Sequence, residues 1–195
     1  MDNYKIILAS SSERRRKILK SLGVKFQILE PQIDESLPKG LSLEKVPAYL
    51  SVKKAEAVFK KLKKSSEIIV IAADTLVLKE GELIGKPRSK KEAFEILKKL
   101  SGAPHTVITG LCVLTDEKRL VKTVKSIVYF RKLTAKEIFS YIKKEKNVFD
   151  KAGAYGVQDF GKVLVERIEG DFYNVVGLPV SALVEMLKKV GVSIL

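Results

Sequence analysis

The chain has 195 residues, and its 37 basic side chains outnumber its 23 acidic ones to give a net charge of +14. Hydrophobic residues make up 46% of the sequence, which is enough for a packed core and excludes a disordered or low-complexity chain. Because Cys112 is the only cysteine, an internal disulfide and a cysteine-based metal site are also excluded. No apolar run approaches the roughly 20 residues that span a bilayer, and Ile6–Ala9 is too short for a signal-peptide core, so we expect a cytoplasmic protein with no membrane partner.

The positive charge comes mostly from lysine, which accounts for 30 of the 37 basic residues. Most of these lysines lie in short runs on predicted helix faces, where solvation is their usual role. A basic field also attracts polyanions, either nucleic acid or a free nucleotide. Aromatic residues for base stacking are few, and the sequence has no RNP-type or zinc-finger motif, so nucleic acid is not favoured as a partner.

The first half of the chain predicts strands that alternate with helices. Ser12 is suited to cap the first helix and Gly23 to end it. The expected elements are a strand at Ile6–Ala9, a helix at Glu13–Leu22, a strand at Lys25–Glu30, a polar loop at Pro31–Gly40, a helix at Leu43–Lys64, a buried strand at Ile68–Ala73 that ends at Asp74–Thr75, and a hairpin of Leu76–Leu78 with Glu82–Ile84.

The second half adds longer strands. Ser89–Glu92 and Thr134–Glu137 match capping boxes, and the helices that they begin are expected to run to Gly102 and Lys146. The other expected elements are strands at Thr106–Thr115, Arg119–Arg131 and Val163–Ile168, an irregular segment at Asp150–Gly161, and a terminal helix from Val180. The mixture predicts an α/β fold with a large twisted sheet, in a single domain over residues 1–195.

Basic and hydroxyl side chains gather where the first strand meets the first helix. Ser10 follows the strand, and Arg14 and Arg15 lie in the first helical turn. A helix N-terminus with nearby hydroxyls and arginines can bind phosphate. A capped helix with solvated arginines explains the same pattern equally well.

Carboxylates occur in two places along the chain. Asp74 follows the buried strand, where a carboxylate can bind a metal or act as a general base, or can simply end the strand in an Asx-turn. Asp34 and Glu35 lie in the polar loop. If carboxylates of the two segments meet in space, they can hold a hard divalent cation through oxygen.

Two further segments place glycine beside a functional side chain. Lys86 lies within Gly85–Pro87 and could contact a phosphate, although turns of this composition are common. Lys151–Gln158 contains small residues that allow close approach of a ligand, and Gln158 offers a donor and an acceptor for a base edge. A purely structural glycine-rich loop is the alternative.

The remaining candidates for covalent chemistry are weaker. His105 is the only histidine, so a histidine metal triad is excluded, and a Ser–His pair would depend on this one residue. Cys112 lies within a predicted strand, which favours a buried structural thiol over a nucleophile.

Taken together, these motifs resemble the Maf family of nucleoside triphosphate pyrophosphatases, in the family's order and over nearly the whole chain. The matching segments are Leu8–Ser10 through Arg14–Arg15, Ile33–Glu35, Lys53–Ala55, Ala73–Thr75, Gly85–Pro87, Leu100–Gly102, Lys151–Gln158 and Val176–Pro179. Each motif alone is weak, but the ordered set is specific. The departure is Glu13, where the family usually has proline, and glutamate is acceptable in a first helical turn.

The resemblance implies a Maf/Ham1-like fold, a long twisted mixed sheet in two lobes with a central cleft. It also implies metal-dependent hydrolysis of the α–β phosphoanhydride of a nucleoside triphosphate. By the same resemblance, Asp74 would be the proton acceptor and, with Glu35, a ligand of Mg²⁺ or Mn²⁺. The residues that would contact the substrate are Ser10, Arg14, Arg15, Lys54, Thr75, Lys86 and Gln158.

Arg14, Thr75 and Gln158 match positions that resemble specificity markers of the dTTP/UTP subgroup, so we expect dTTP, UTP and modified pyrimidine nucleotides as substrates. The same chemistry on 7-methyl-GTP or another nucleotide is the alternative. A nucleic-acid-binding protein, or a septum-formation regulator without enzymatic activity, is the alternative from a different class. The family commonly forms homodimers, which makes a homodimer one possible assembly, and the sequence itself leaves the oligomeric state open.

Overall fold

The computed structural model of the chain describes residues 4–62 and 67–195. The chain divides into two compact units, each assembled from separate stretches of sequence. Unit 1 contains residues 1–74, 109–124 and 177–195, and unit 2 contains residues 75–108 and 125–176. The chain therefore leaves unit 1 and returns to it twice.

The helices and strands follow one another in an order close to the predicted one. The strands are β1 (Lys5–Leu8), β2 (Phe26–Ile28), β3 (Ile68–Lys79), β4 (Glu82–Ile84), β5 (Pro104–Leu114), β6 (Arg119–Phe130) and β7 (Val165–Glu169). The α-helices are α1 (Glu13–Ser21), α2 (Val46–Phe59), α3 (Lys90–Leu100), α4 (Ala135–Lys144), α5 (Phe172–Val176) and α6 (Val180–Lys189). The short 3-10 helices are η1 (Leu43–Lys45), η2 (Val148–Asp150), η3 (Ala152–Ala154) and η4 (Phe160–Leu164). Across residues 4–62 and 67–195, none of the helices is both long enough and apolar enough to span a membrane.

The described strands form a seven-stranded mixed sheet in the order β2-β1-β3-β5-β6-β7, with β4 paired to β3 off this path. β1 is parallel to β2 and β3, whereas β4 and β7 are antiparallel to β3 and β6. The predicted α/β fold with a large mixed sheet is confirmed, and the two units correspond to the two expected lobes. The expected cleft and the expected single domain over residues 1–195 stay predictions.

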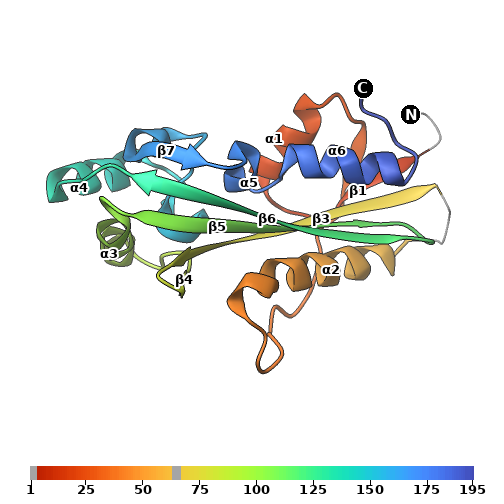
Figure 1. The fold of residues 1–195 in the computed structure, drawn as a ribbon, viewed down its shortest axis with the longest axis horizontal. Coiled ribbons are helices and arrows are strands. Elements are labelled where there is room, and N and C mark those ends of the chain that lie inside the picture. The colour runs from red at the N-terminus through yellow and green to blue at the C-terminus, as the bar shows by residue number, and fades with distance from the viewer. Residues whose placement is uncertain (1–3, 63–66) are drawn as a thin grey trace. The chain divides into compact units, whose positions relative to one another are not determined.

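Unit 1 has helices on both faces of its part of the sheet. α1 and α6 cover one face and α2 covers the other, as Figure 1 shows. Under α2, the buried Ala55 packs in one cluster with Val70 and Cys112. The start of α2 lies so close to β5 that a Cβ added to Gly110 would be 2.2 Å from the Ala48 nitrogen, which leaves room for glycine alone. This close packing fixes α2, and with it the position from which its lysines project.

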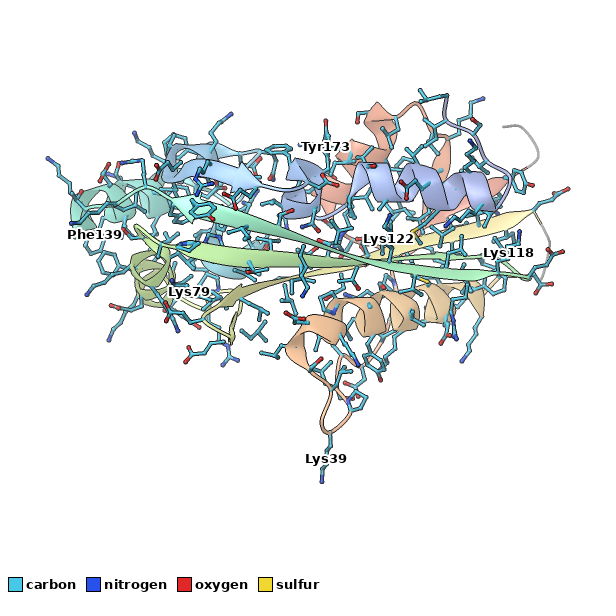
Figure 2. The ribbon with its side chains drawn as sticks, in the orientation of Figure 1. Lys39, Lys79, Lys118, Lys122, Phe139 and Tyr173 are labelled. Atoms are coloured by element: carbon cyan, nitrogen blue, oxygen red, sulfur yellow. The ribbon has the colours of Figure 1, made fainter. Side chains whose placement is uncertain are left out.

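Unit 2 packs α3 against α4 and encloses an aromatic cluster. The rings of Phe94 on α3 and Phe139 on α4 stack with their centroids 4.5 Å apart, and Phe139, labelled in Figure 2, stays 62% exposed. In the interior, the Tyr155 ring meets Phe130 and His105 edge-on, at centroid distances of 4.8 and 5.4 Å. The glycine-rich segment that carries Tyr155 is thereby tied into the core of unit 2.

The expected end of the central strand at Asp74–Thr75 is wrong. β3 continues to Lys79, because β1 pairs with its first part at Ile68–Ile71 and β4 pairs with its last part at Val77–Lys79. Asp74 therefore lies inside a continuous strand, between the stretches that pair with these two neighbours. The polar pair Asp74–Thr75 interrupts the apolar pattern, so the local pattern of residues predicted two strands where the structure has one.

The helices differ from prediction at several ends. The helix expected at Leu43–Lys64 begins as η1 and continues as α2 to Phe59, while Lys64 lies outside the described residues. The segment Asp150–Gly161 is irregular, as predicted, and is made largely of 3-10 turns. The short helix α5 was not predicted. The Asp171 carboxylate caps its start by accepting hydrogen bonds from the backbone N–H groups of residues 173 and 174.

One of the two predicted capping boxes is complete. At α4, the Thr134 hydroxyl accepts from the Glu137 backbone N–H, and the Glu137 carboxylate accepts from the Thr134 N–H. At α3, the Ser89 hydroxyl accepts from the Glu92 N–H as predicted, but the Glu92 carboxylate accepts from the N–H of Arg88 instead. The second box is thus half formed, and α3 still begins where the sequence indicated.

Candidate functional site

In unit 1, the Lys54 ammonium lies between two carboxylates. Its Nζ is 2.5 Å from Asp74 Oδ1 on β3 and 2.9 Å from Glu35 Oε1 in the loop that follows β2. The side chains of Lys54 and Asp74 are 13% and 15% exposed, whereas that of Glu35 is 59% exposed. The two predicted carboxylates therefore contact the same cation, and the Glu35 side of this cluster is open to solvent.

A second lysine holds the loop that carries Glu35. Lys53 Nζ donates to the backbone carbonyl oxygen of Asp34 at 2.6 Å. The Asp34 carboxylate accepts hydrogen bonds from the hydroxyl and the N–H of Ser36, and these bonds lower the pKa of Asp34. The Asp34 carboxylate is thus hydrogen-bonded within its own loop, and Glu35 is the loop carboxylate that contacts Lys54.

Arg15 projects from α1 toward the same region of unit 1. Its Nε donates to the carbonyl oxygen of Gly177 at 2.8 Å, and a terminal nitrogen lies 3.4 Å from Ser10 Oγ. Burial lowers the pKa of Arg15 to about 10, against the opposing effect of the negative charges of Asp74 and Glu35. Arg15 therefore remains a cation at neutral pH and lies within electrostatic range of both carboxylates.

Ser10 and Arg14 lie at the start of α1. Ser10 is buried, and its hydroxyl accepts from the backbone N–H of Ser12 at 3.1 Å. Ser12 precedes α1 as predicted, but its side chain makes no capping hydrogen bond. Arg14 is half-buried, and its positive charge contributes to the lowered pKa of Arg15. The predicted site residues that unit 1 brings together are Ser10, Arg14, Arg15, Glu35, Lys54 and Asp74.

Unit 2 places two of the predicted glycine-containing segments side by side. The Gly153 backbone N–H donates to the carbonyl oxygen of Gly85 at 3.1 Å. Gly153 has a φ of 75°, the left-handed conformation that glycine adopts without strain. Lys86, the residue after Gly85, is exposed, and Thr75 on β3 is half-buried. Gly85–Pro87 and Lys151–Gln158 are therefore neighbours in space.

Gln158 is held by the residue that follows it. Its Nε2 donates to Asp159 Oδ2 at 2.7 Å, while its Oε1 is buried and has no hydrogen-bond partner in the part of the chain that the structure describes. Lys151 Nζ lies 3.6 Å from the same Asp159 oxygen and 3.1 Å from Glu145 Oε1. Unit 2 thus also contains a lysine between two carboxylates, and this lysine side chain is only 2% exposed.

The histidine and the cysteine are structural, as the sequence favoured. His105 Nε2 and the Tyr155 hydroxyl are 2.7 Å apart in the core of unit 2. Burial lowers the pKa of His105 to about 4, and the nearby charge of Lys79 lowers it as well, so His105 is neutral at pH 7. Burial also raises the pKa of the Cys112 thiol to about 12, which leaves no reactive thiolate.

The predicted metal ligands can be tested against the geometry of unit 1. Glu35 and Asp74 present carboxylate oxygens to one nitrogen cation, and an all-oxygen donor pair suits a hard ion such as Mg²⁺ or Mn²⁺. Over residues 4–62 and 67–195, no group of three or more His, Cys, Asp or Glu side chains could hold a metal ion. The pair of carboxylates fits a divalent cation that takes its other ligands from elsewhere.

Three contacts at these sites were missed from the sequence. Gly177, which anchors Arg15, lies 162 residues further along the chain, so no local pattern connects the two. Lys53 and Asp159 are adjacent to the predicted residues Lys54 and Gln158. Their charge beside a predicted site residue is the feature of the sequence that could have indicated these contacts.

Fold and site together define a mixed α/β protein that gathers arginine, lysine and carboxylate side chains in its first unit. A family profile described as Maf-like protein matches residues 5–190, and the chain belongs to this family. The resemblance noted from the sequence motifs is thereby confirmed.

Curated relatives match over nearly their full length. A protein of Caldicellulosiruptor bescii named dTTP/UTP pyrophosphatase is 49% identical over 96% of this chain and 95% of its own. Proteins of the same name from Thermotoga maritima and Porphyromonas gingivalis are 45% and 41% identical, over 96% and 99% of this chain and 90% and 98% of theirs. Among solved structures, the Staphylococcus aureus Ham1 protein aligns with 65% of this chain and 71% of its own, at 17% identity and a TM-score of 0.43.

Proposed function

We propose that this chain hydrolyses the α–β phosphoanhydride of dTTP and UTP, releasing the nucleoside monophosphate and pyrophosphate. The relatives named dTTP/UTP pyrophosphatase, at 41–49% identity over nearly the full length, support this activity and this pair of substrates. The structural observation that carries the proposal is the Lys54 ammonium between Asp74 and Glu35, with Arg15 in electrostatic range. Phosphoryl chemistry depends mainly on such positioning and charge neutralisation.

Asp74 is the proposed proton acceptor. Its side chain is 15% exposed, so water reaches it, while the surrounding protein keeps the carboxylate largely out of bulk solvent. In this position it would orient or deprotonate the water that attacks the α-phosphorus. Lys54 holds the Asp74 carboxylate in place, with its Nζ 2.5 Å from Asp74 Oδ1.

The cations of unit 1 are the proposed phosphate contacts. A nucleoside triphosphate carries about four negative charges near pH 7, and Arg14, Arg15 and Lys54 offset part of them. Ser10 adds a hydroxyl beside Arg15. A divalent cation, Mg²⁺ or Mn²⁺, would be held by Glu35 and Asp74 together with phosphate oxygens, and when bound it supplies further charge neutralisation and a more acidic water.

The family resemblance also implies substrate contacts from three residues that lie in unit 2. Lys86 has an exposed ammonium that can meet a phosphate, and Thr75 lies next to Asp74 on β3. Gln158 has an amide that can read a base edge. A cytoplasmic location, expected from the sequence, and a homodimer, suggested by the family resemblance, stay predictions.

The test is pyrophosphate release from dTTP, UTP, CTP, GTP, 7-methyl-GTP and ITP, with and without Mg²⁺ or Mn²⁺. Metal-dependent release from dTTP and UTP is the expected result. Release mainly from 7-methyl-GTP or ITP would keep the chemistry and overturn the pyrimidine preference. A folded protein that releases pyrophosphate from none of them would overturn the proposed activity, and salt-dependent binding to DNA or RNA would then favour the nucleic-acid alternative.

A further inference from the structure

The two ends of the Gln158 amide have different surroundings. Nε2 donates to Asp159 Oδ2 at 2.7 Å, and Oε1 is buried without a partner among the described residues. An ionised carboxylate only accepts hydrogen bonds, so it attracts the NH₂ end of an amide and repels the oxygen end. Asp159 therefore determines which end of Gln158 is left for a ligand, and that end is the acceptor.

Asp159 is itself held from inside unit 2. Lys151 Nζ lies 3.6 Å from Asp159 Oδ2 and is fixed by Glu145 Oε1 at 3.1 Å and by the Asn147 carbonyl oxygen at 3.0 Å. The lysine side chain is 2% exposed and that of Asp159 is 43% exposed, so solvent screens their attraction less than it screens a pair of two surface groups. The chain of contacts runs from a buried lysine, through Asp159, to Gln158.

The backbone around this chain of contacts leaves little space for rearrangement. A Cβ added to Gly156 would lie 2.7 Å from Lys151 Cε and 3.0 Å from Asp159 Oδ2. A Cβ added to Gly161 would lie 2.6 Å from the Gly156 carbonyl oxygen. Glycine at both positions lets the loop close over the lysine and keeps Asp159 beside Gln158.

We propose that Asp159, held by Lys151, is a positioning residue that presents Gln158 Oε1 to the base, and that this selects uracil and thymine over cytosine. The proposal rests on the proposed function and adds to it the atom that reads the base. Uracil and thymine have an N–H donor at N3, which pairs with an acceptor oxygen. Cytosine has an unprotonated acceptor nitrogen at N3, which the same oxygen repels. A buried acceptor left unpaired by the wrong base costs affinity, so the preference follows from one fixed amide.

Asp159→Asn is the direct test, because asparagine offers both a donor and an acceptor and no longer fixes the amide. The variant should fold, since Asp159 is 43% exposed and Lys151 keeps its Glu145 and Asn147 partners. We expect the ratio of kcat/KM for UTP to that for CTP to fall about tenfold, the effect of one hydrogen bond. Asp159→Ala, which removes both the charge and the hydrogen-bonding group, should lower the ratio similarly.

Asp150→Asn is the matched control, since it makes the same charge change at an exposed position in the same segment. Its UTP-to-CTP ratio should equal that of the wild type, and all variants should share the wild-type thermal midpoint. An unchanged ratio in Asp159→Asn, or an equal fall in Asp150→Asn, would overturn the positioning role. A wild type that uses UTP and CTP equally would overturn it as well. A wild type that hydrolyses no nucleotide would instead overturn the proposed function.

Discussion

Each unit of the molecule contains a lysine between two carboxylates, and the two arrangements differ in their contact with solvent. In unit 1, Lys54 joins Asp74 to Glu35, whose side chain is 59% exposed. In unit 2, Lys151 joins Glu145, 6% exposed, to Asp159, 43% exposed. The Lys54 side chain is itself 13% exposed and that of Lys151 is 2% exposed. Solvent therefore reaches the lysine more readily in unit 1, whereas in unit 2 the lysine and one of its two carboxylates are enclosed by protein.

The difference shows how burial assigns a role to an ion pair. A pair that water and ligands reach can exchange its partner, which suits phosphate and metal binding. A pair enclosed by protein cannot lose a partner without leaving an uncompensated charge, which suits it to fixing a loop. On this basis, we assign Lys54 to the proposed reaction and Lys151 to the proposed positioning of Gln158.

The largest effect on stability is expected from Lys151→Met. This change leaves the Glu145 carboxylate buried without its cation, so the free energy of unfolding should fall by about 3–5 kcal/mol. Urea unfolding followed by circular dichroism measures it. Lys146→Met, at an exposed lysine nearby, is the control and should stay close to wild type. If the two variants were equally stable, the contrast between the units would be lost.

Asp74→Asn should act on turnover and leave stability nearly unchanged. Loss of a general base typically lowers the rate by about a hundred- to ten-thousand-fold. Lys54 keeps Glu35 as a partner at 2.9 Å, so unit 1 should remain folded. Pyrophosphate release from UTP and the thermal midpoint are the two measurements. Asp116→Asn, in the turn between β5 and β6, is the control, and wild-type turnover in Asp74→Asn would contradict the assigned role.

A third effect concerns pH and the interior of unit 2. Burial lowers the pKa of His105 from 6.5 to about 4, so between these values the unfolded chain binds a proton that the folded chain does not. The resulting stability is complete above pH 6.5 and is lost as the pH falls toward 4, by about 3 kcal/mol. Urea unfolding at several pH values measures the slope. In His105→Gln, which can still bond to Tyr155, this slope should flatten, and an unchanged slope would assign it to other groups.

Lys54→Met is expected to cost less stability than Lys151→Met. Asp74 keeps the charge of Arg15 within range and Glu35 is largely solvated, so the loss should be about 1.5 kcal/mol, the value of one hydrogen bond to a charged group. Pyrophosphate release should nevertheless fall clearly. A loss of stability as large as that of Lys151→Met would mean that Lys54 too serves the architecture.

More of the fold than of the contacts within the site could be predicted from the sequence. Hydrophobic runs and capping residues placed most helices and strands, because these signals act within a few residues. The continuation of β3 through Asp74 was missed because the polar pair Asp74–Thr75 separates the apolar runs Ile68–Ala73 and Leu76–Leu78, which therefore resembled two strands. α5 was missed because it spans only five residues and begins at a single aspartate.

Single motifs and the family resemblance predicted which residues belong to the site. They did not predict the contacts that these residues make. The sequence predicted a cation site if Asp74 and Glu35 lie close together. The structure shows that both carboxylates contact the Lys54 ammonium. Neither the anchoring of Arg15 by Gly177 nor the pairing of Lys151 with Glu145 follows from local spacing. Long-range contacts of this kind are set by the tertiary fold alone.

The scattered origin of unit 1 has a consequence for its biosynthesis. The carbonyl oxygen that anchors Arg15 belongs to Gly177, which is translated after every residue of unit 2. A nascent chain therefore holds Arg14, Lys54 and Asp74 long before Arg15 has its final partner and before α6 covers its face of the sheet. A ribosome that stops before residue 177 releases a product without this anchor, so only chains that are translated past it can complete the surroundings of Arg15.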